Sequence, residues 1–193
     1  SLVGQMKDEV QMVCCRYQRC KWEAVAPIDL SGTYRVYTDE GLVEQIFCNH
    51  YNANVCMKLF RRDILESNQI RFKQGCLMED QYFIADYLRV CHAAAFTNDR
   101  MYYYIDTPGS IMNSFRDRPS VGYRYVDLPR SWVYSAEATA PYKKICRTVK
   151  ARSAVHYQSV LRKIVPENKA FIAEARVYVK KHLHLLLLQK WMM

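Results

Sequence analysis

The sequence of 193 residues predicts an α/β protein made of two parts. Strand-like and helix-like segments alternate up to about residue 119. After it the sequence has helical patterns, which prolines separate from one another. Half of the residues are hydrophobic and 24% are charged, which is typical of a globular chain and argues against a disordered tail. We therefore expect a mixed sheet with flanking helices over residues 1–119 and a mainly helical extension over residues 120–193.

The expected strands are short. Residues 10–15 form an apolar run of strand length, which residues 16–22 continue in a more polar form. Residues 33–38 alternate and are rich in Tyr, Val and Thr, which favours a strand. The first half of residues 55–65 could be a strand, and residues 95–105 are strand-like, with an aromatic block near their end.

The expected helices differ in clarity. Residues 42–47 begin a helix, residues 62–67 form a short one, and residues 79–93 form the clearest. The apolar residues of this last segment recur on one helical face: Phe83, Ile84, Tyr87, Leu88 and Cys91. Two or three more helices are expected at about residues 121–138, 142–165 and 167–190. Loop or turn chemistry marks residues 27–32, 71–75 and 106–110.

The charge is distributed unevenly. Residues 121–193 hold 14 of the 28 Lys and Arg but only 4 of the 19 Asp and Glu, a net charge of +10. Residues 1–120 hold 14 basic and 15 acidic side chains and are almost neutral. This asymmetry indicates that the second part faces an anionic partner, such as a membrane surface or a nucleic acid.

The eight cysteines include no Cys-x-x-Cys pair and no zinc-like spacing with the five histidines. Several lie in apolar runs, so we expect a reduced, cytoplasmic protein. Charged residues at positions 7–9 interrupt any signal-peptide core, and no stretch approaches the roughly 20 apolar residues that span a bilayer.

An acidic pair, Glu79 and Asp80, begins the clearest helix. Asp80 precedes Phe83, Ile84 and Tyr87 by three, four and seven residues, which predicts that it lies on the inward face. An inward carboxylate beside a glycine-containing loop is a catalytic candidate. The alternative is that both acids only cap the helix and complement its dipole.

Five short segments occur in an order and spacing that resemble the family 2 glycosyltransferases, bacterial enzymes of the GT-A fold that build surface polysaccharides or lipooligosaccharides. The resemblance covers residues 54–112 well, residues 1–53 loosely, and residues 113–193 only in their helical character. The segments are residues 54–63 (NVCMKLFRRD), 70–72 (IRF), 79–83 (EDQYF), 102–104 (YYY) and 109–111 (GSI).

The resemblance implies an inverting transfer of sugar from a nucleotide-sugar donor to a glycan or lipid-linked acceptor. Asp80 matches the catalytic base that deprotonates the acceptor hydroxyl, and Glu79 is its acidic neighbour. Lys58, Tyr104 and Ser110 match positions that contact the acceptor or donor. Each of these three also has a structural alternative. Lys58 can be a solvated lysine beside a strand, Tyr104 can belong to the packing face of a strand, and Ser110 can simply form a turn.

The complete enzymes also have an N-terminal nucleotide-binding half, whose Asp-x-Asp motif holds Mg²⁺ or Mn²⁺ on the diphosphate. The chain contains neither that motif nor a Gly-rich phosphate loop. We therefore expect the divalent metal only in the complete enzyme, with its ligands outside this chain. This chain alone is expected to be inactive.

The basic C-terminal residues mix charge with apolar positions, ending in Leu185–Leu188 and Trp191. Such helices can lie in a membrane interface, which predicts peripheral contact with the inner face of the cytoplasmic membrane. Alternatively, the leucines pack on their own domain and the charges are a solvated face. A second function also stays open: a non-catalytic basic module that binds a membrane surface or nucleic acid, although no nucleic-acid motif is present.

Overall fold

The computed structural model of the chain divides into two compact units. The first is Ser1–Arg71 with Asp86–Ser110, and the second is Phe72–Ala85 with Ile111–Met193. The description that follows covers residues 4, 9–20, 27–28, 30, 32–48, 51, 53–105, 107, 126–162 and 169–189, without the side chains of residues 183 and 186–189.

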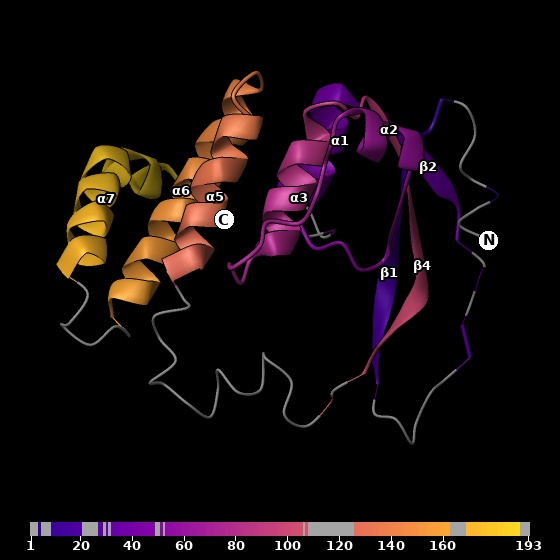
Figure 1. The fold of residues 1–193 in the computed structure, drawn as a ribbon, viewed down its shortest axis with the longest axis horizontal. Coiled ribbons are helices and arrows are strands. Elements are labelled where there is room, and N and C mark those ends of the chain that lie inside the picture. The colour runs from indigo at the N-terminus through magenta and orange to yellow at the C-terminus, as the bar shows by residue number, and fades with distance from the viewer. Residues whose placement is uncertain are drawn as a thin grey trace. The chain divides into compact units, whose positions relative to one another are not determined.

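The first unit is built on a mixed four-stranded sheet with the order β2-β4-β1-β3 (Figure 1). The central pair, β1 (Met12–Cys20) and β4 (Ala93–Ile105), is parallel. The outer strands β2 (Tyr34–Thr38) and β3 (Lys58–Phe60) run antiparallel to their neighbours. The two long central strands carry the apolar stretches, because a strand covered on both faces needs continuous hydrophobic residues.

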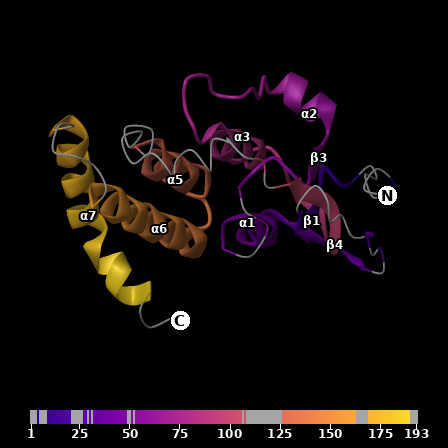
Figure 2. The same cartoon turned by 90° about the horizontal axis from the view of Figure 1, so that it is seen from below.

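The register aligns four residues directly across the sheet: Arg35 of β2, Phe96 of β4, Cys14 of β1 and Lys58 of β3. Residues directly opposite one another in paired strands point to the same face. Helix α1 (Asp39–Phe47) contacts β2 and β4 and lies beside the strands in Figures 1 and 2. Its buried residues recur at helical spacing: Leu42, Val43, Ile46 and Phe47.

The opposite face of the sheet holds a small core of its own. Val13 and Ala95 pair across β1 and β4 and are almost completely buried. Val10 joins them, and the half-buried Tyr34 packs against this cluster. Both faces of the first halves of the two central strands therefore exclude water.

A bulge interrupts the parallel pairing. Cys14 pairs with Phe96, whereas Arg16, two residues later, pairs with Arg100, four residues later. The extra residues belong to β4, and they leave part of its backbone without a partner in β1. Tyr51 satisfies one such group, because its hydroxyl donates to the Thr97 carbonyl oxygen at 2.9 Å.

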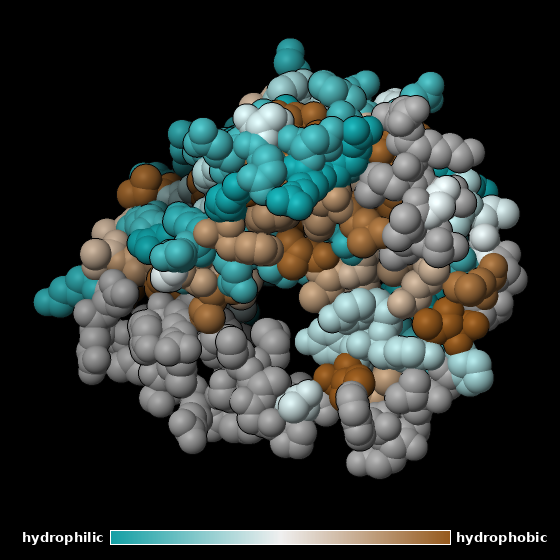
Figure 3. All heavy atoms as spheres, turned by 45° about the vertical axis from the view of Figure 1, so that its right-hand side comes forward, coloured by the Kyte–Doolittle hydropathy of each residue, from teal (hydrophilic) through white to brown (hydrophobic). Residues whose placement is uncertain are grey.

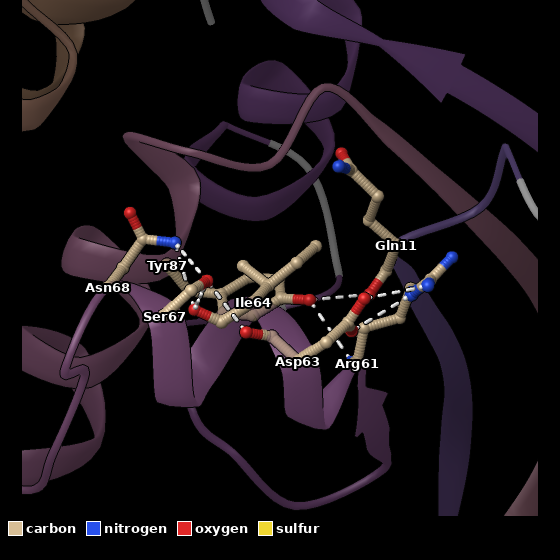
Figure 4. A network of polar contacts seen from close by, with 7 residues as sticks. All are labelled: Gln11, Arg61, Asp63, Ile64, Ser67, Asn68 and Tyr87. Carbon is tan, nitrogen blue, oxygen red and sulfur yellow. Dashed lines mark hydrogen bonds and ion pairs between the residues drawn. The ribbon is translucent and has the colours of Figure 1, made fainter.

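Helix α3 (Glu79–Leu88) has residues in both units. Its end is tied to the first unit by Tyr87, whose hydroxyl donates to the Gln11 carbonyl at 2.5 Å and accepts the Arg61 N–H at 3.2 Å (Figure 4). Arg61 precedes the short helix α2 (Arg62–Ser67) and forms an ion pair with Asp63 at 2.7 Å in its first turn. The buried Tyr87 thus joins β1, α2 and the end of α3.

The second unit contains α5 (Asp127–Ala138), α6 (Lys143–Leu161) and α7 (Lys169–Gln189). Helix α6 packs on both of its neighbours (Figure 2). The core between α6 and α7 consists of Tyr157, Val160, Phe171 and Ala175. Aligned apolar positions on each helix, rather than helix propensity alone, explain why these basic segments are helical.

The predicted α/β class is confirmed: the described residues form a mixed open sheet and six helices. The strands expected near residues 10–22, 33–38 and 95–105 and the helix at 62–67 are present. The helix predicted over residues 79–93 was too long, because it ends at Leu88 and β4 begins at Ala93. The expected turn at residues 106–110 lies almost entirely outside the described residues.

Candidate functional site

Glu79 and Asp80 form the first turn of α3, and both are half-buried. The backbone just before them is anchored to α5, since the Leu77 N–H donates to the Asp127 carboxylate at 3.1 Å. The Gln81 N–H donates to the Met78 carbonyl at 3.0 Å, which closes the first turn. The acidic pair therefore occupies a fixed position between an exposed loop and a buried helix.

Gln81, which follows the acidic pair, is buried and fixes the orientation of this turn. Its side-chain oxygen accepts from the Ser131 hydroxyl at 3.0 Å, and its amide donates to the Ser135 hydroxyl at 3.3 Å. Ser135 in turn donates to the Ser131 carbonyl at 2.9 Å. A buried amide with both ends bonded holds its helix rigidly, because breaking either bond would leave a polar group unpaired.

Aromatic contacts support the same helix start. The Tyr82 ring lies 5.0 Å from that of Tyr134 on α5, and the Lys73 ammonium lies 4.1 Å above Tyr82. Phe72 stacks on Phe83 at 4.5 Å. Burial raises the pKa of Tyr82 to about 12, so this phenol stays neutral at physiological pH.

Lys58 is buried, and its ammonium is used by the segment that follows α1. It donates to the carbonyls of Tyr51 at 3.0 Å and Asn54 at 2.7 Å, and to the Asn54 side chain at 3.3 Å. An ammonium has three N–H donors, and these contacts with described residues engage it inside the protein. Lys58 therefore positions Tyr51. The sequence analysis left two alternatives for this lysine, contact with a ligand or solvation beside a strand, and the second is wrong, since only 9% of Lys58 is exposed.

Tyr104 lies near the end of β4 and is 38% exposed. Its ring lies 5.6 Å from that of Tyr17 on β1, so the two form an aromatic pair that solvent reaches. Ser110, the last candidate, lies outside the described residues. The structure thus brings Glu79 and Asp80 together in one unit, whereas Lys58 and Tyr104 belong to the other.

A pocket of about 210 Å³ lies in the first unit, and the sequence analysis did not predict it. It is lined by Arg16 and Arg35, by aromatic rings and by neutral polar side chains. The two arginines come from strands that are not neighbours, and no spacing in the sequence connects them. A usable signal was available only at Arg16, a charged residue directly after four buried positions of β1.

The basic helices of the second unit use much of their apolar surface internally. Phe171, Ala175 and Leu185 are buried, whereas Val177 is 69% exposed. Basic side chains are exposed along both α6 and α7: Lys143, Lys144, Arg147, Lys169, Arg176, Lys180 and Lys181. The predicted peripheral membrane contact stays a prediction.

Within the described ranges, no group of three or more His, Cys, Asp or Glu side chains could hold a metal ion, and the metal expected for the complete enzyme stays a prediction. None of the helices described there reaches the length and apolarity that crossing a membrane requires. No protein-family model matches the chain, and no curated protein matches it either.

Proposed function

We propose that this chain is the acceptor-side part of an inverting glycosyltransferase that resembles family 2 of the GT-A fold, with Asp80 as the general base. One observation carries the proposal. The ordered series of family-like segments leads to an acidic pair that is half-buried at the first turn of α3.

The position of Asp80 suits a general base. A base must be ordered enough to meet its substrate in one geometry and open enough to reach it. The neighbouring Gln81 is buried and bonded at both ends of its amide, which supplies the order. Asp80 itself is half-buried, so part of the residue stays exposed to solvent.

The proposed reaction is a single displacement. The Asp80 carboxylate takes the proton of an acceptor hydroxyl while that oxygen forms a bond to the anomeric carbon of the donor sugar. The bond from that carbon to the nucleoside diphosphate breaks, and the diphosphate leaves with the electron pair. Attack opposite the leaving group inverts the configuration.

Asp80→Asn tests the role of Asp80 in the longest gene product that contains this chain. The amide keeps the shape of the carboxylate but cannot accept the proton, so we expect kcat to fall by about 100- to 10,000-fold with little change in the KM for the donor. The measurement is release of nucleoside diphosphate from a panel of UDP-, GDP- and dTDP-sugars in the presence of bacterial glycan acceptors.

Asp86→Asn is the matched control, because Asp86 lies on the same helix and pairs with Arg89 at 3.0 Å. Loss of this partly exposed ion pair should alter turnover by less than about twofold. Full activity of Asp80→Asn would remove Asp80 from the mechanism. If the wild-type protein turned over none of the donors, the proposed function itself would be wrong.

A further inference from the structure

The pocket of the first unit lies where the bulge of β4 separates it from β1. Phe96, the last residue paired before the bulge, lies between Cys14 of β1 and Arg35 of β2 in the register. Arg16 stands two residues after Cys14 on β1, and therefore on the same face. The interrupted pairing makes room at this point, and side chains from both sides of β4 line the space.

Two permanent cations face this space with little to neutralise them. Arg16 and Arg35 line the pocket, and none of the described residues that line it is acidic. The Arg16 Nε is buried, and no hydrogen-bond partner for it is found among the described residues. Buried N–H donors are almost always paired in folded proteins, so the described residues leave the hydrogen bonding of this guanidinium incomplete.

Aromatic rings form the apolar part of the lining. Phe96 is 2% exposed and meets the edges of two tyrosine rings, Tyr51 at 4.7 Å and Tyr37 at 5.6 Å. The Arg16 guanidinium lies over the Tyr51 ring, 4.8 Å from its centroid. Burial raises the pKa of the Tyr51 phenol against the opposing effect of Arg16, so the ring adds no negative charge at neutral pH.

The lining is held in place before any ligand arrives. Lys58 fixes the backbone at Tyr51, and the Tyr51 hydroxyl is bonded to the bulge. On the other side, the buried Asp99 accepts the Gly32 N–H at 2.7 Å and so fixes the residue before Thr33. Neutral hydrogen-bonding side chains complete the pocket: Thr33, Gln45 and Asn98.

We infer that this pocket binds a phosphate monoester about the size of a monosaccharide phosphate, with the phosphate between Arg16 and Arg35. A carboxylate is satisfied by one bidentate arginine, whereas a phosphate has three oxygens and can take two arginines from different sides. These arginines come from strands on opposite sides of β4, about 10 Å apart. The rings and neutral polar groups then suit the sugar, and a volume of about 210 Å³ is too small for a dinucleotide.

The test is isothermal titration of the full chain with four probes: glucose 6-phosphate, glucose, glucuronate and inorganic phosphate. We expect glucose 6-phosphate to bind at least about tenfold more tightly than each of the others, because it alone offers both a phosphate and a ring. Arg35→Gln and Arg16→Gln should each weaken that binding by at least about tenfold. Arg62→Gln, an exposed arginine on α2 that does not line the pocket, is the charge-matched control and should change it by less than about twofold.

Arg35 is exposed on the outer strand β2, so its replacement is expected to leave the fold intact even if Arg16→Gln does not fold. Unchanged affinity in Arg35→Gln would overturn the inference. Equal affinity for glucuronate or for inorganic phosphate, or no binding of any probe, would overturn it as well. The readout is binding rather than sugar transfer, and it stands independently of the role proposed for Asp80.

Discussion

Gly32 shows how a single residue fixes one wall of the pocket. Its N–H donates to the buried Asp99 carboxylate at 2.7 Å, and the Asp99 N–H donates to the Thr97 hydroxyl at 3.2 Å. A Cβ at Gly32 would lie 2.2 Å from the Asp99 oxygen and 3.0 Å from the Thr97 hydroxyl. Any side chain at this position would therefore break the contact that fixes the start of β2.

Gly32→Ala is expected to destabilise the protein by about 1–3 kcal/mol, because it combines a steric clash with the loss of a hydrogen bond to a charged group. Gly41→Ala is the control. Its Cβ would meet only Tyr37, at 3.6 Å, and in helix α1 it should stabilise by about 0.5–1 kcal/mol. Urea unfolding followed by circular dichroism measures both, and equal effects of the two changes would contradict this account.

Lys58 illustrates what the sequence could and could not predict at this scale. Its position next to a short strand was recognisable, but the described acceptors of its ammonium belong to a loop four to seven residues earlier in the chain. No periodicity describes that loop, so the sequence left the ammonium either solvated or bound to ligand. Asp80 was easier to locate, because the helix that it begins has a clear apolar face.

At the scale of elements, helices α5, α6 and α7 are joined by one polar cluster. Arg130 of α5 donates from its Nε and from one terminal nitrogen to the two carboxylate oxygens of Glu174 on α7. The Nε lies 3.0 Å from its acceptor oxygen. Tyr157 of α6 donates to the same carboxylate at 2.6 Å. The hydrogen bonds from Arg130 hold the pKa of Glu174 below its ordinary value, although partial burial opposes them.

The lowered pKa of Glu174 makes the stability of these helices depend on pH. The stabilisation is complete above the ordinary carboxyl pKa of 4.5 and is lost as the pH falls through the lower value of the folded state. We expect Glu174→Gln to lower the free energy of unfolding by about 1 kcal/mol at pH 7, a figure reduced for the partial exposure of the pair. The variant should also lose less stability than the wild type between about pH 5 and pH 3. Thermal unfolding from pH 7 to pH 3 measures this.

The exposed Glu137→Gln on α5 serves as the control for that series, since it removes a carboxylate from the same unit. Its thermal stability should fall between about pH 5 and pH 3 as steeply as that of the wild type. If the stability of Glu174→Gln fell with pH as steeply as that of the wild type, other carboxylates would dominate the loss of stability in acid.

The elements also show where prediction from sequence succeeds. Some segments were located within a few residues, such as α2 and β4. The end of α3 was misjudged because Cys91 continues the apolar period of the helix, although it is buried in the turn before β4. The bulge in β4 was beyond prediction, since it depends on pairing with a strand far away in the chain. The pocket was missed for the same reason.

For the molecule as a whole, hydrophilic and hydrophobic residues are interspersed among the coloured atoms of the face in Figure 3. Some of the eight cysteines are buried and the others are half-buried, and none forms a disulfide bond. Four are buried: Cys14, Cys15, Cys91 and Cys146. Burial raises the pKa of the Cys14 and Cys91 thiols to about 12, so neither forms a thiolate at neutral pH.

The thiols therefore report on global unfolding. With Ellman's reagent at pH 8, we expect the half-buried cysteines to react first: Cys20, Cys48, Cys56 and Cys76. The four buried thiols should react only at the rate at which the protein opens, and all eight should react at once in guanidinium chloride. Rapid reaction of all eight thiols without denaturant would contradict the burial described here. Mass spectrometry of the labelled peptides identifies which cysteines react.

The pairing of β1 with β4 also governs how the protein folds. Gln11 and Ala93, which meet where these strands begin, lie 82 residues apart in the chain. The central sheet cannot close until that whole span has been synthesised, and closing a long loop before its contacts form is slow. Helices α5 to α7 pack on their neighbours in sequence, so their contacts are local and can form quickly. On a ribosome, the apolar β1 is exposed until β4 emerges, and during that interval it needs protection from aggregation.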